Sequence, residues 1–448
     1  MKRILTTVVL LLVILACILG IRGWRKAPVE SFACSDCNIL VIDIDPLRLD
    51  AVHAFGNARE ITPFLDSFAK QSISFNNAVA VSSWTLPSAM SLMTGTYPSR
   101  HGIINKVLLS NVDKQEYPAT LSKTAPSFTT LAEELKAHGY TTAGFAGGAA
   151  LDPSYGFNKG FDAYESPGEF EGTVEPLEKA LSFINLHKND KFFVFVQGFD
   201  VHGQYIPKEG LDLRFVDKKY SGQLTGSAPE QKSIREDGVL HGSVFLTNED
   251  VQFLRSVYDE KVTKLDSRLA DFFQRLEKLQ PSKKTIIIFT SDHGEEFYEH
   301  GRIDHGMTLY DEVIRVPLLF NIPQKRSQII SQQIRNIDIA PTILEIVGIT
   351  PSAVFKKQLD GTSIVPMLQG KTMNIDTILE TSYRYATFLE GVRTHDGWKF
   401  IRDEEHHAEE LYNIPESKGE TQNLIGVKNS KETKLLNILN TFIAHRNR

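Results

Sequence analysis

The chain has 448 residues, which is enough for two or three average domains or for one large α/β domain. Hydrophobic residues make up 42% and charged residues 23%, so the composition is that of an ordinary globular protein. The formal net charge of −6, without a long Lys/Arg block, gives no electrostatic footprint for nucleic acid, and we set nucleic-acid binding aside.

The N-terminal region carries an uninterrupted apolar run over residues 4–21, with basic residues on both sides. As a helix rising about 1.5 Å per residue, this run spans roughly the 30 Å hydrocarbon core of a membrane. A cleaved signal peptide is the alternative, but basic residues stand where small residues would precede a cleavage site. A lipoprotein-like processing site at Cys17 is a further alternative. We expect residues 1–33 to anchor an extracytoplasmic protein, periplasmic or at the cell surface.

Two cysteines, Cys34 and Cys37, stand just before the first predicted strand. Redox chemistry is one interpretation of this Cys-x-x-Cys, and a small disulfide in an oxidising compartment is the other. Nothing redox-like surrounds the pair, so we expect the disulfide. A chain with three cysteines and no second metal-type cluster does not indicate a zinc finger.

Three strand-like apolar runs each end in an acid or an imidazole. The runs cover residues 38–44, 192–199 and 285–289, and they are followed by Asp45, by Asp200 and His202, and by Asp292 and His293. In open α/β sheets, ligands bind at the carboxyl edge, where loops and helix N-termini converge. The pattern therefore predicts a metal-dependent enzyme with its site at that edge.

A nucleophile-like position follows the first of these strands. Thr85 begins the run Thr85-Leu86-Pro87-Ser88, which continues into a short helix-like segment up to Thr94 and is closed by Gly95. Thr85 could simply cap this helix, or it could react there, because a helix N-terminus favours a nearby anion.

Several separate motifs together resemble the sulfatase branch of the alkaline phosphatase superfamily. They span roughly residues 38–415 in the family's order and comprise 38–48, Thr62-Pro63-Phe64-Leu65, 84–102, Gly156-Phe157, Gly160-Phe161-Asp162, 291–294, His305-Gly306, Arg315-Val316-Pro317, 338–342 and Glu410-Leu411-Tyr412. The resemblance implies an alkaline phosphatase-like three-layer α/β sandwich with a large mostly parallel sheet and a smaller C-terminal α+β subdomain. We place the catalytic domain at residues 34–372 and the subdomain at 373–448.

The C-terminal region shows its own local signals. Residues 391–401 contain an Asp396-Gly397 pair between two strand-like runs, which predicts a hairpin. Residues 431–446 carry apolar residues at helical spacing, which predicts a packing helix.

The resemblance implies that Asp45, Asp292 and His293, with the Thr85 hydroxyl, hold one divalent metal ion. An isolated acid at a strand end would more often be a helix cap or a turn residue. Carboxylates combined with an imidazole favour Mn²⁺ or Zn²⁺, although Ca²⁺ is possible. Relatives that use Ca²⁺ typically have another acid where Pro46 stands and Asn where His293 stands.

The sequence departs from true sulfatases at the nucleophile and around it. Their Cys or Ser is oxidised to formylglycine, which Thr85 cannot become, whereas phosphate-processing relatives use an unmodified Thr. Ala89 replaces an Arg of the family motif, and residues 146–149 replace a Gly-Lys-x-His. Both departures remove cations that would hold sulfate oxygens.

Four further residues have candidate roles. His202 and His305 match family positions that contact the transferred group and protonate the leaving oxygen, although a lone histidine is more often structural. Asp200 could bind substrate or orient His202, or it could cap a loop. Arg48 could support Asp45 or touch the substrate, and an ordinary salt bridge is an equal alternative.

We therefore expect a hydrolase that cleaves a phosphoester or phosphodiester through Thr85. A sulfatase with a non-standard nucleophile, a phospho-alcohol transferase and an inactive member that binds anionic glycans or lipids are the alternatives. The expected partner is an anionic ester on a glycan, a lipid or a small molecule.

Overall fold

The computed structural model describes residues 31–104, 128–167, 172–207, 211–241, 245–281, 283–381, 387–417 and 419–445. Its main sheet contains β1 (Asn38–Ile44), β2 (Ile73–Val79), β3 (Thr141–Ala146), β4 (Ala163–Glu165), β5 (Phe192–Gly198), β6 (Thr285–Thr290), β9 (Arg315–Asn321), β10 (Gln328–Ile330) and β11 (Ile334–Arg335). The strand order is β10-β2-β9-β6-β1-β5-β3-β4, and β11 also pairs with β2.

The main sheet is mostly parallel, as predicted. Strand β9 runs antiparallel to both of its neighbours, β2 and β6, and the other described pairings in this sheet are parallel. Every residue of β1 and of β5 is buried. Strands covered on both faces read as continuous apolar runs, which is why these two strands were recognisable from the sequence.

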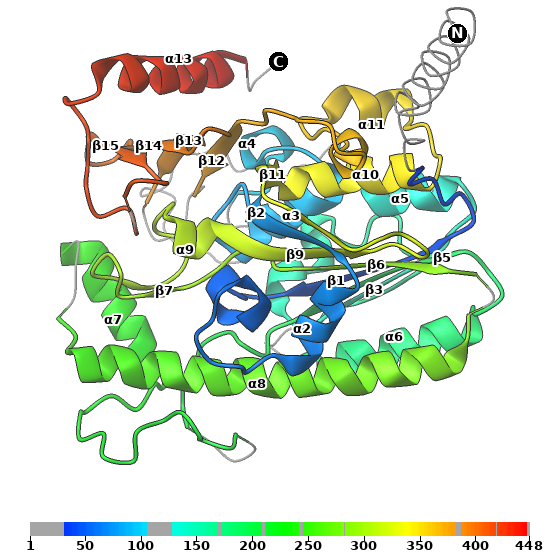
Figure 1. Ribbon diagram of the computed structural model, residues 1–448, viewed down its shortest axis with the longest axis horizontal. Helices are drawn as coiled ribbons and strands as arrows, with labels where there is room; N and C mark the ends of the chain where they lie inside the picture. The colour runs from blue at the N-terminus through cyan, green and yellow to red at the C-terminus, as the bar shows by residue number, and fades with distance from the viewer. Residues whose placement is uncertain are drawn as a thin grey trace, which may run out of the picture.

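Helices cover both faces of the sheet, which gives the three layers of Figure 1. One layer contains α3 (Thr85–Thr94), α5 (Leu131–Ala137), α10 (Ile339–Ile346), α11 (Ala353–Gln358) and α12 (Val365–Leu368). The other contains α2 (Pro63–Lys70), α6 (Val174–Leu186) and the long α8 (Asn248–Leu279). The remaining described helices of these layers and their loops are α4 (Pro98–His101), α7 (Ala228–His241), α9 (Asp311–Ile314) and the short 3-10 helices η1 (Leu49–Ala51), η2 (His53–Phe55), η3 (Ala149–Leu151), η4 (Pro153–Tyr155) and η5 (Asn336–Asp338).

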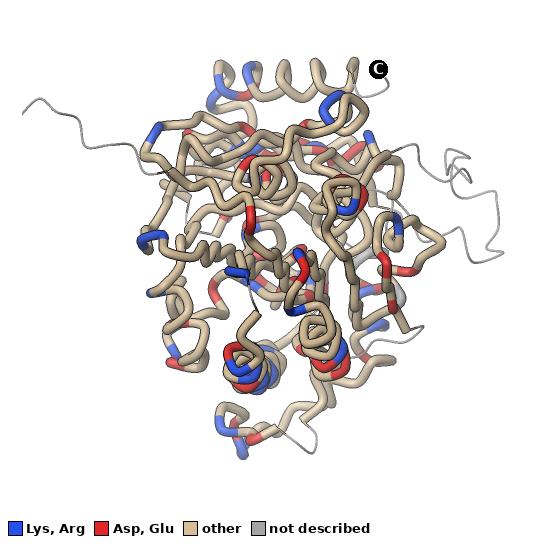
Figure 2. Tube along the Cα trace, turned by 90° about the vertical axis from the view of Figure 1, so that its right-hand side faces the viewer, with Lys and Arg blue, Asp and Glu red and all other residues tan. Residues whose placement is uncertain are grey.

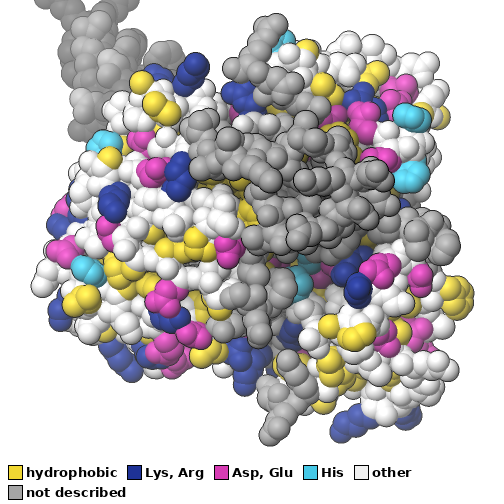
Figure 3. Space-filling model, turned by 180° about the vertical axis from the view of Figure 1, so that it is seen from behind, with side chains coloured by type: hydrophobic (Ala, Val, Ile, Leu, Met, Phe, Trp, Pro, Cys, Tyr) yellow, Lys and Arg dark blue, Asp and Glu magenta, His cyan; other side chains and the backbone are white. Residues whose placement is uncertain are grey.

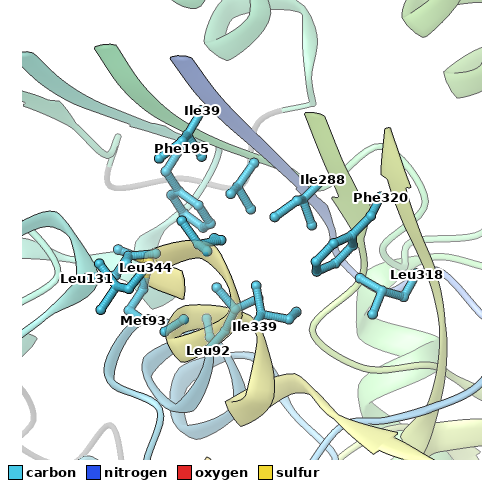
Figure 4. Packing of buried hydrophobic residues seen from close by; sticks show 14 of the residues in the cluster. Ile39, Leu92, Met93, Leu131, Phe195, Ile288, Leu318, Phe320, Ile339 and Leu344 are labelled. Atoms are coloured by element: carbon cyan, nitrogen blue, oxygen red, sulfur yellow. The ribbon is translucent and has the colours of Figure 1, made fainter. Parts of the chain in front are cut away.

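The alternation of β1 assigns its side chains to the two layers. Ile39 and Val41 belong to the core under α3 and α10, whereas Leu40, Ile42 and Ile44 belong to the core under α6 and α8. Figure 4 shows the first of these cores, where Ile39 lies among residues from other strands and from α3, α5 and α10. Because successive side chains of a strand point to opposite faces, Asp43 and Asp45 share the α3 side with Ile39 and Val41.

The smaller C-terminal subdomain has an antiparallel sheet of β12 (Thr377–Glu380), β13 (Leu389–Arg393), β14 (Trp398–Asp403) and β15 (Ala408–Asn413). The predicted Asp396-Gly397 turn joins β13 to β14, and α13 (Asn429–His445) packs against the sheet through Leu435 and Leu439. A two-stranded sheet of β7 (Glu296–Phe297) and β8 (Ile303–Asp304) lies in the loop that follows β6.

A buried ion cluster joins the subdomain to the catalytic part. Lys399 of β14 is fully buried, and its Nζ lies 2.6 Å from Asp311 and 2.7 Å from Glu420. Arg393 of β13 also pairs with Asp311, at 3.0 Å. Asp311 begins α9, directly before β9, so this cluster fixes the small sheet against the end of a main-sheet strand.

The described chain reaches β1 through a tethered segment. Cys34 and Cys37 form the expected disulfide, with 5.5 Å between their Cα atoms. The Cys34 amide donates to Ile346 O at the end of α10, and Lys325 Nζ donates to Ser31 O. Within the described residues, no helix is long and apolar enough to cross a membrane. The predicted anchor at residues 4–21 lies outside those residues.

Charged residues of both signs are interspersed on the outer helices. Figure 2 shows Lys and Arg next to Asp and Glu along the helices at its lower side. Figure 3, which views the molecule from behind relative to Figure 1, shows the same mixture on the described part of that face. Such a surface has no extended single-sign field in these views.

Candidate active site

The predicted metal ligands meet at the carboxyl ends of two neighbouring strands. Strands β1 and β6 pair in parallel, with Asp43 opposite Thr290, so Asp45 and Asp292 leave the sheet side by side. Candidate ligand atoms of Asp45, Asp292 and His293 all lie within 4.8 Å of one another. His293 Nε2 lies 3.2 Å from Asp45 Oδ1 and 3.7 Å from Asp292 Oδ2.

Ser291 ties the two strand ends together. Its hydroxyl accepts a 2.9 Å hydrogen bond from the Leu47 amide and lies within hydrogen-bond distance of the carbonyl oxygens of Ile44 and His293. The loop after β1 and the loop after β6 are therefore held in one fixed arrangement. Ser291 belongs to the motif 291–294, but the sequence predicted no role for it.

Helix α3 presents Thr85 to these ligands. Gly95 ends the helix in the left-handed conformation at φ 67°, as the sequence suggested. The Thr85 hydroxyl donates a 2.7 Å hydrogen bond to Asp45 Oδ2 and lies 3.3 Å from His293 Nε2. Thr85 is buried, so the structure brings the predicted nucleophile and all three predicted carboxylate and imidazole ligands into one enclosed site.

The electrostatics of the site follow from burying several charges together. Burial and the neighbouring Asp45 carboxylate raise the pKa of Asp292 well above its usual range. Burial disfavours the ionised form of Asp45, but His293, with His202 and His305, holds the pKa of Asp45 below its usual range. Burial lowers the pKa of His293, but the carboxylates of Asp292 and Asp45 outweigh it and raise this pKa to about 9.

The residues present fit a divalent cation. Asp45 Oδ1 and Asp292 Oδ2 are buried and have no hydrogen-bond partner among the described residues. His293 Nδ1 lies 2.8 Å from Gly294 O and donates to it, so Nε2 is the nitrogen that would bind a cation in exchange for its proton. Buried carboxylate oxygens without a hydrogen bond are costly, and a cation between these two oxygens would remove that cost.

Asp43 is a buried acid that the sequence analysis missed. It is fully buried, and Gln197 Nε2 lies 3.5 Å from its Oδ2. Burial and the Asp45 charge raise the pKa of Asp43 well above its usual range. Its position two residues before Asp45 was the available signal, because residues i and i+2 of a strand share a face.

The two candidate acid–base histidines lie beside the ligands. The rings of His202 and His305 are 5.1 Å apart, and the rings of His305 and His293 are 4.4 Å apart. Burial lowers the pKa of His202 to about 4. Lys261 of α8 donates to the carbonyl oxygens of His202 and Gln204, so the long helix supports the loop after β5.

Glu295 is the second acid that the sequence analysis missed. It is fully buried, and its Oε1 lies 3.0 Å from His305 Nδ1. Burial and the Asp304 carboxylate raise the pKa of Glu295 to about 8. A carboxyl group three residues after Asp292 was visible in the sequence, but its pairing with His305 was not.

Asp200 and Arg48, the candidate substrate-binding residues, are both paired with other protein groups. Asp200 accepts from the Thr173 amide and from Arg268 of α8, which is the loop-capping alternative. Arg48 donates to Asp50, at 2.7 and 2.8 Å, and to Glu299, at 2.6 Å, which is the salt-bridge alternative. Their charges are already paired within the fold, so neither residue enters our proposal as a substrate ligand.

Neutral residues stand where the family motifs have Arg and Lys. Ala89 is buried within α3. Gly147 stands where the family pattern has Lys, and its amide donates to Gln197 O at 2.9 Å. Neither residue can supply a positive charge to the site.

The three-layer fold and this cluster of hydroxyl, carboxylate and imidazole groups define an alkaline phosphatase-like ester hydrolase. The Sulfatase family model matches residues 37–349, and the model for the C-terminal part of N-sulphoglucosamine sulphohydrolase matches residues 298–445. The chain belongs to the sulfatase family.

The relatives include sulfatases and phosphonate hydrolases. The chain is 23% identical to the multifunctional alkaline phosphatase superfamily protein PehA of Trinickia caryophylli, over 78% of this chain and 80% of that protein. It is 25% identical to N-acetylglucosamine-6-sulfatase of Capra hircus, over 69% of this chain and 60% of that enzyme. Among solved structures, a putative sulfatase of Bacteroides thetaiotaomicron superposes with a TM-score of 0.72 at 19% identity, covering 92% of this chain and 93% of that one. The phosphonate monoester hydrolase of Agrobacterium radiobacter superposes with a TM-score of 0.65 at 17% identity, covering 92% and 95%.

Proposed function

We propose that the protein is a metal-dependent hydrolase that cleaves a phosphoester or phosphodiester with Thr85 as nucleophile. The observation that carries the proposal is the Thr85 hydroxyl, which begins α3 and donates its 2.7 Å hydrogen bond to Asp45. A hydroxyl in this position has a proton acceptor within reach and a helix N-terminus that favours an anion next to it.

Asp45, Thr85, Asp292 and His293 are the proposed ligands of one divalent metal ion. One imidazole among carboxylates favours Mn²⁺ or Zn²⁺ over Ca²⁺, which prefers oxygen ligands only. When bound, such an ion lowers the pKa of a ligating hydroxyl and neutralises charge on the reacting group.

The proposed reaction has two steps that this chain's residues share. Thr85 Oγ1 transfers its proton toward Asp45 and attacks phosphorus, the ester P–O bond breaks, and His202 or His305 protonates the leaving oxygen. In the second step the same histidine takes a proton from water as the water oxygen attacks phosphorus, and the Thr85–phosphate bond breaks. The threonine hydroxyl regains its proton from Asp45, and phosphate is released from a monoester substrate or a phosphomonoester from a diester.

The residue at the nucleophile position favours phosphorus over sulfur. Formylglycine releases sulfate by elimination from a hydrated aldehyde, and a sulfated threonine has no such route. The neutral residues Ala89 and Gly147 agree with this preference, because strong sulfate binding would need cations there. The similarity to PehA and to phosphonate monoester hydrolases is consistent with it. Cleavage of a sulfate ester is the second candidate, because other relatives are sulfatases.

We further propose that residues 4–21 anchor the protein in a membrane and that the catalytic part works outside the cytoplasm. The support is the length of the apolar run and the basic residues on both sides. The Cys34–Cys37 disulfide is consistent with an oxidising compartment.

The test is a substrate panel combined with trapping of the intermediate. Purified protein with added Mn²⁺, Zn²⁺ or Ca²⁺ is assayed on aryl sulfate, phosphate monoester, phosphodiester and phosphonate, and an added alcohol acceptor distinguishes transfer from hydrolysis. We expect Thr85→Ala to lose nearly all turnover and Thr85→Ser to retain part, and mass spectrometry of a quenched reaction to find phosphate on the Thr85 peptide. Thr94→Ala, which removes a buried hydroxyl at the far end of α3, is the control. Wild-type turnover by Thr85→Ala would exclude the nucleophile assignment, and selective cleavage of aryl sulfate would favour the second candidate.

A further inference from the structure

We propose that Glu295, braced by Tyr205, is the positioning residue that orients His305 for proton transfer to the leaving oxygen. This inference rests on the proposed function and assigns one of its two candidate histidines a supporting group.

Glu295 connects the imidazole to a buried hydroxyl. Its Oε1 accepts from His305 Nδ1 at 3.0 Å, and its Oε2 accepts from the Tyr205 hydroxyl. The exposed fractions of Glu295, Tyr205 and His305 are 0%, 1% and 1%. A hydrogen bond at Nδ1 fixes the ring orientation and tautomer, so that the opposite nitrogen, Nε2, is the one that would transfer the proton.

The neighbouring acid, Asp304, has a different task. Its Oδ1 lies 3.0 Å from His305 Nδ1, but it accepts from the His305 main-chain amide at 2.8 Å. Its Oδ2 pairs with Arg235 of α7. Asp304 also has a φ of 81°, a left-handed conformation that costs free energy for a residue other than glycine. The Arg235 ion pair and the amide hydrogen bond hold the Asp304 backbone in place. The hydrogen bond of His305 Nδ1 is therefore made to Glu295.

A second metal ion is the competing explanation for this cluster. Candidate ligand atoms of Glu295, Asp304 and His305 lie within 4.8 Å of one another. However, the Tyr205 hydroxyl already donates to Glu295, and the Arg235 guanidinium already pairs with Asp304. Those partners favour an oriented imidazole over a cation.

The decisive variants are Glu295→Gln and its matched control, Glu296→Gln. Glu296 is also buried, accepts from the Thr308 hydroxyl at 2.8 Å, and does not enter the proposed machinery. Each variant is assayed on a phosphoester with an alkyl leaving group and on the corresponding nitrophenyl ester, and its metal content is measured. His305→Ala is assayed in parallel.

We expect Glu295→Gln to lower kcat on the alkyl ester roughly 10²-fold, with KM nearly unchanged and the nitrophenyl ester affected only a few-fold. The nitrophenyl leaving group needs no proton in the transition state, so loss of the acid slows only the alkyl ester. A merely structural defect would instead slow both esters equally. Glu296→Gln should show no such selectivity. Tyr205→Phe removes only the brace, and it should give a smaller loss of the same selectivity.

The outcomes separate this inference from the function on which it rests. If His305→Ala shows no leaving-group selectivity, the assignment of His305 as the acid fails. If His305→Ala is selective and Glu295→Gln is not, the positioning role alone is overturned. Loss of metal from Glu295→Gln would also overturn it and make Glu295 a ligand. If Glu295→Gln does not fold, Tyr205→Phe decides, and equal effects on both esters count against the proposal.

Discussion

The Ser88 hydroxyl donates a 2.6 Å hydrogen bond to the main-chain oxygen of Asp292. Ser88 lies one turn after Thr85 in α3, and Asp292 directly precedes His293, so this bond locks the nucleophile helix to the ligand loop. Asn336 donates to the same hydroxyl at 3.0 Å. The helix and the ligand loop are therefore positioned as one unit.

Ser88→Ala should weaken both the fold and metal binding. The variant leaves the Asn336 amide and the Asp292 carbonyl without this partner, which should lower the free energy of unfolding by about 1–3 kcal/mol. A shifted ligand loop should lower metal affinity roughly 10-fold. Urea unfolding and metal titration measure the two effects. Ser91→Ala, which removes a buried hydroxyl 3.1 Å from His101 on the same helix, is the control and should affect stability alone. Equal metal affinity in wild type and Ser88→Ala would contradict the locking role.

The Asp292 carboxylate should be essential for metal retention. We expect purified protein to hold about one divalent ion, and Asp292→Asn to lose most of it, because an amide oxygen is a weaker ligand than a carboxylate. Elemental analysis after gel filtration provides the measurement. Asp266→Asn changes a buried acid that caps the start of α2 through the amides of Phe64 and Leu65, and it should retain the ion. Unchanged metal content in Asp292→Asn would refute the ligand assignment.

Acid should destabilise the protein partly through His101. Burial lowers the pKa of His101 to about 3 from an ordinary value of 6.5. Between these two pH values the unfolded chain binds a proton that the folded chain does not bind. His101 therefore contributes stability above pH 6.5 that is lost as the pH falls toward 3, at about 1.4 kcal/mol per pH unit. Urea unfolding of wild type and His101→Gln from pH 7 to pH 5 measures this contribution. The difference between them should shrink with that slope, and parallel profiles would show that His101 is not kept neutral.

Lys399 should be among the costliest charged side chains to remove. Lys399→Met would leave the Asp311 and Glu420 carboxylates buried without their shared cation, which should cost about 3–5 kcal/mol. Lys431→Met breaks an exposed pair with Asp396 and should cost under about 1 kcal/mol. Thermal and urea unfolding compare the two variants. Adding Glu420→Gln to Lys399→Met should recover part of the lost stability. A Lys399→Met variant as stable as Lys431→Met would contradict a stabilising role for the buried ion cluster.

The sequence predicted those elements whose signal is local. Strands β1, β5 and β6 are continuous apolar runs because both faces of the sheet are covered, and Asp396-Gly397 marks a turn by its own chemistry. The ligand residues follow strand ends, and adjacent parallel strands bring such ends together without further information.

What the sequence did not predict depends on partners far along the chain. The contact between Glu295 and His305 requires the β7–β8 hairpin to fold the chain back on itself. Arg268, which pairs with Asp200, stands 68 residues later on α8. A charged side chain near a motif cannot be assigned to substrate or to scaffold until its counter-ion is known, and this is why the sequence left both alternatives open for Asp200 and Arg48.

The route by which the chain reaches the sheet has a consequence for which molecules can meet Thr85. Lys325, the Cys34–Cys37 disulfide and Ile346 hold the described N-terminal segment at the amino end of β1, whereas Asp45 follows its carboxyl end. Seven strand residues separate the two ends by roughly 20 Å. If residues 4–21 hold the protein at a bilayer, as proposed, the chain enters the described fold at the end of β1 opposite to Thr85. Dissolved esters or polymers standing off the membrane can then meet the catalytic edge without passing the attachment point.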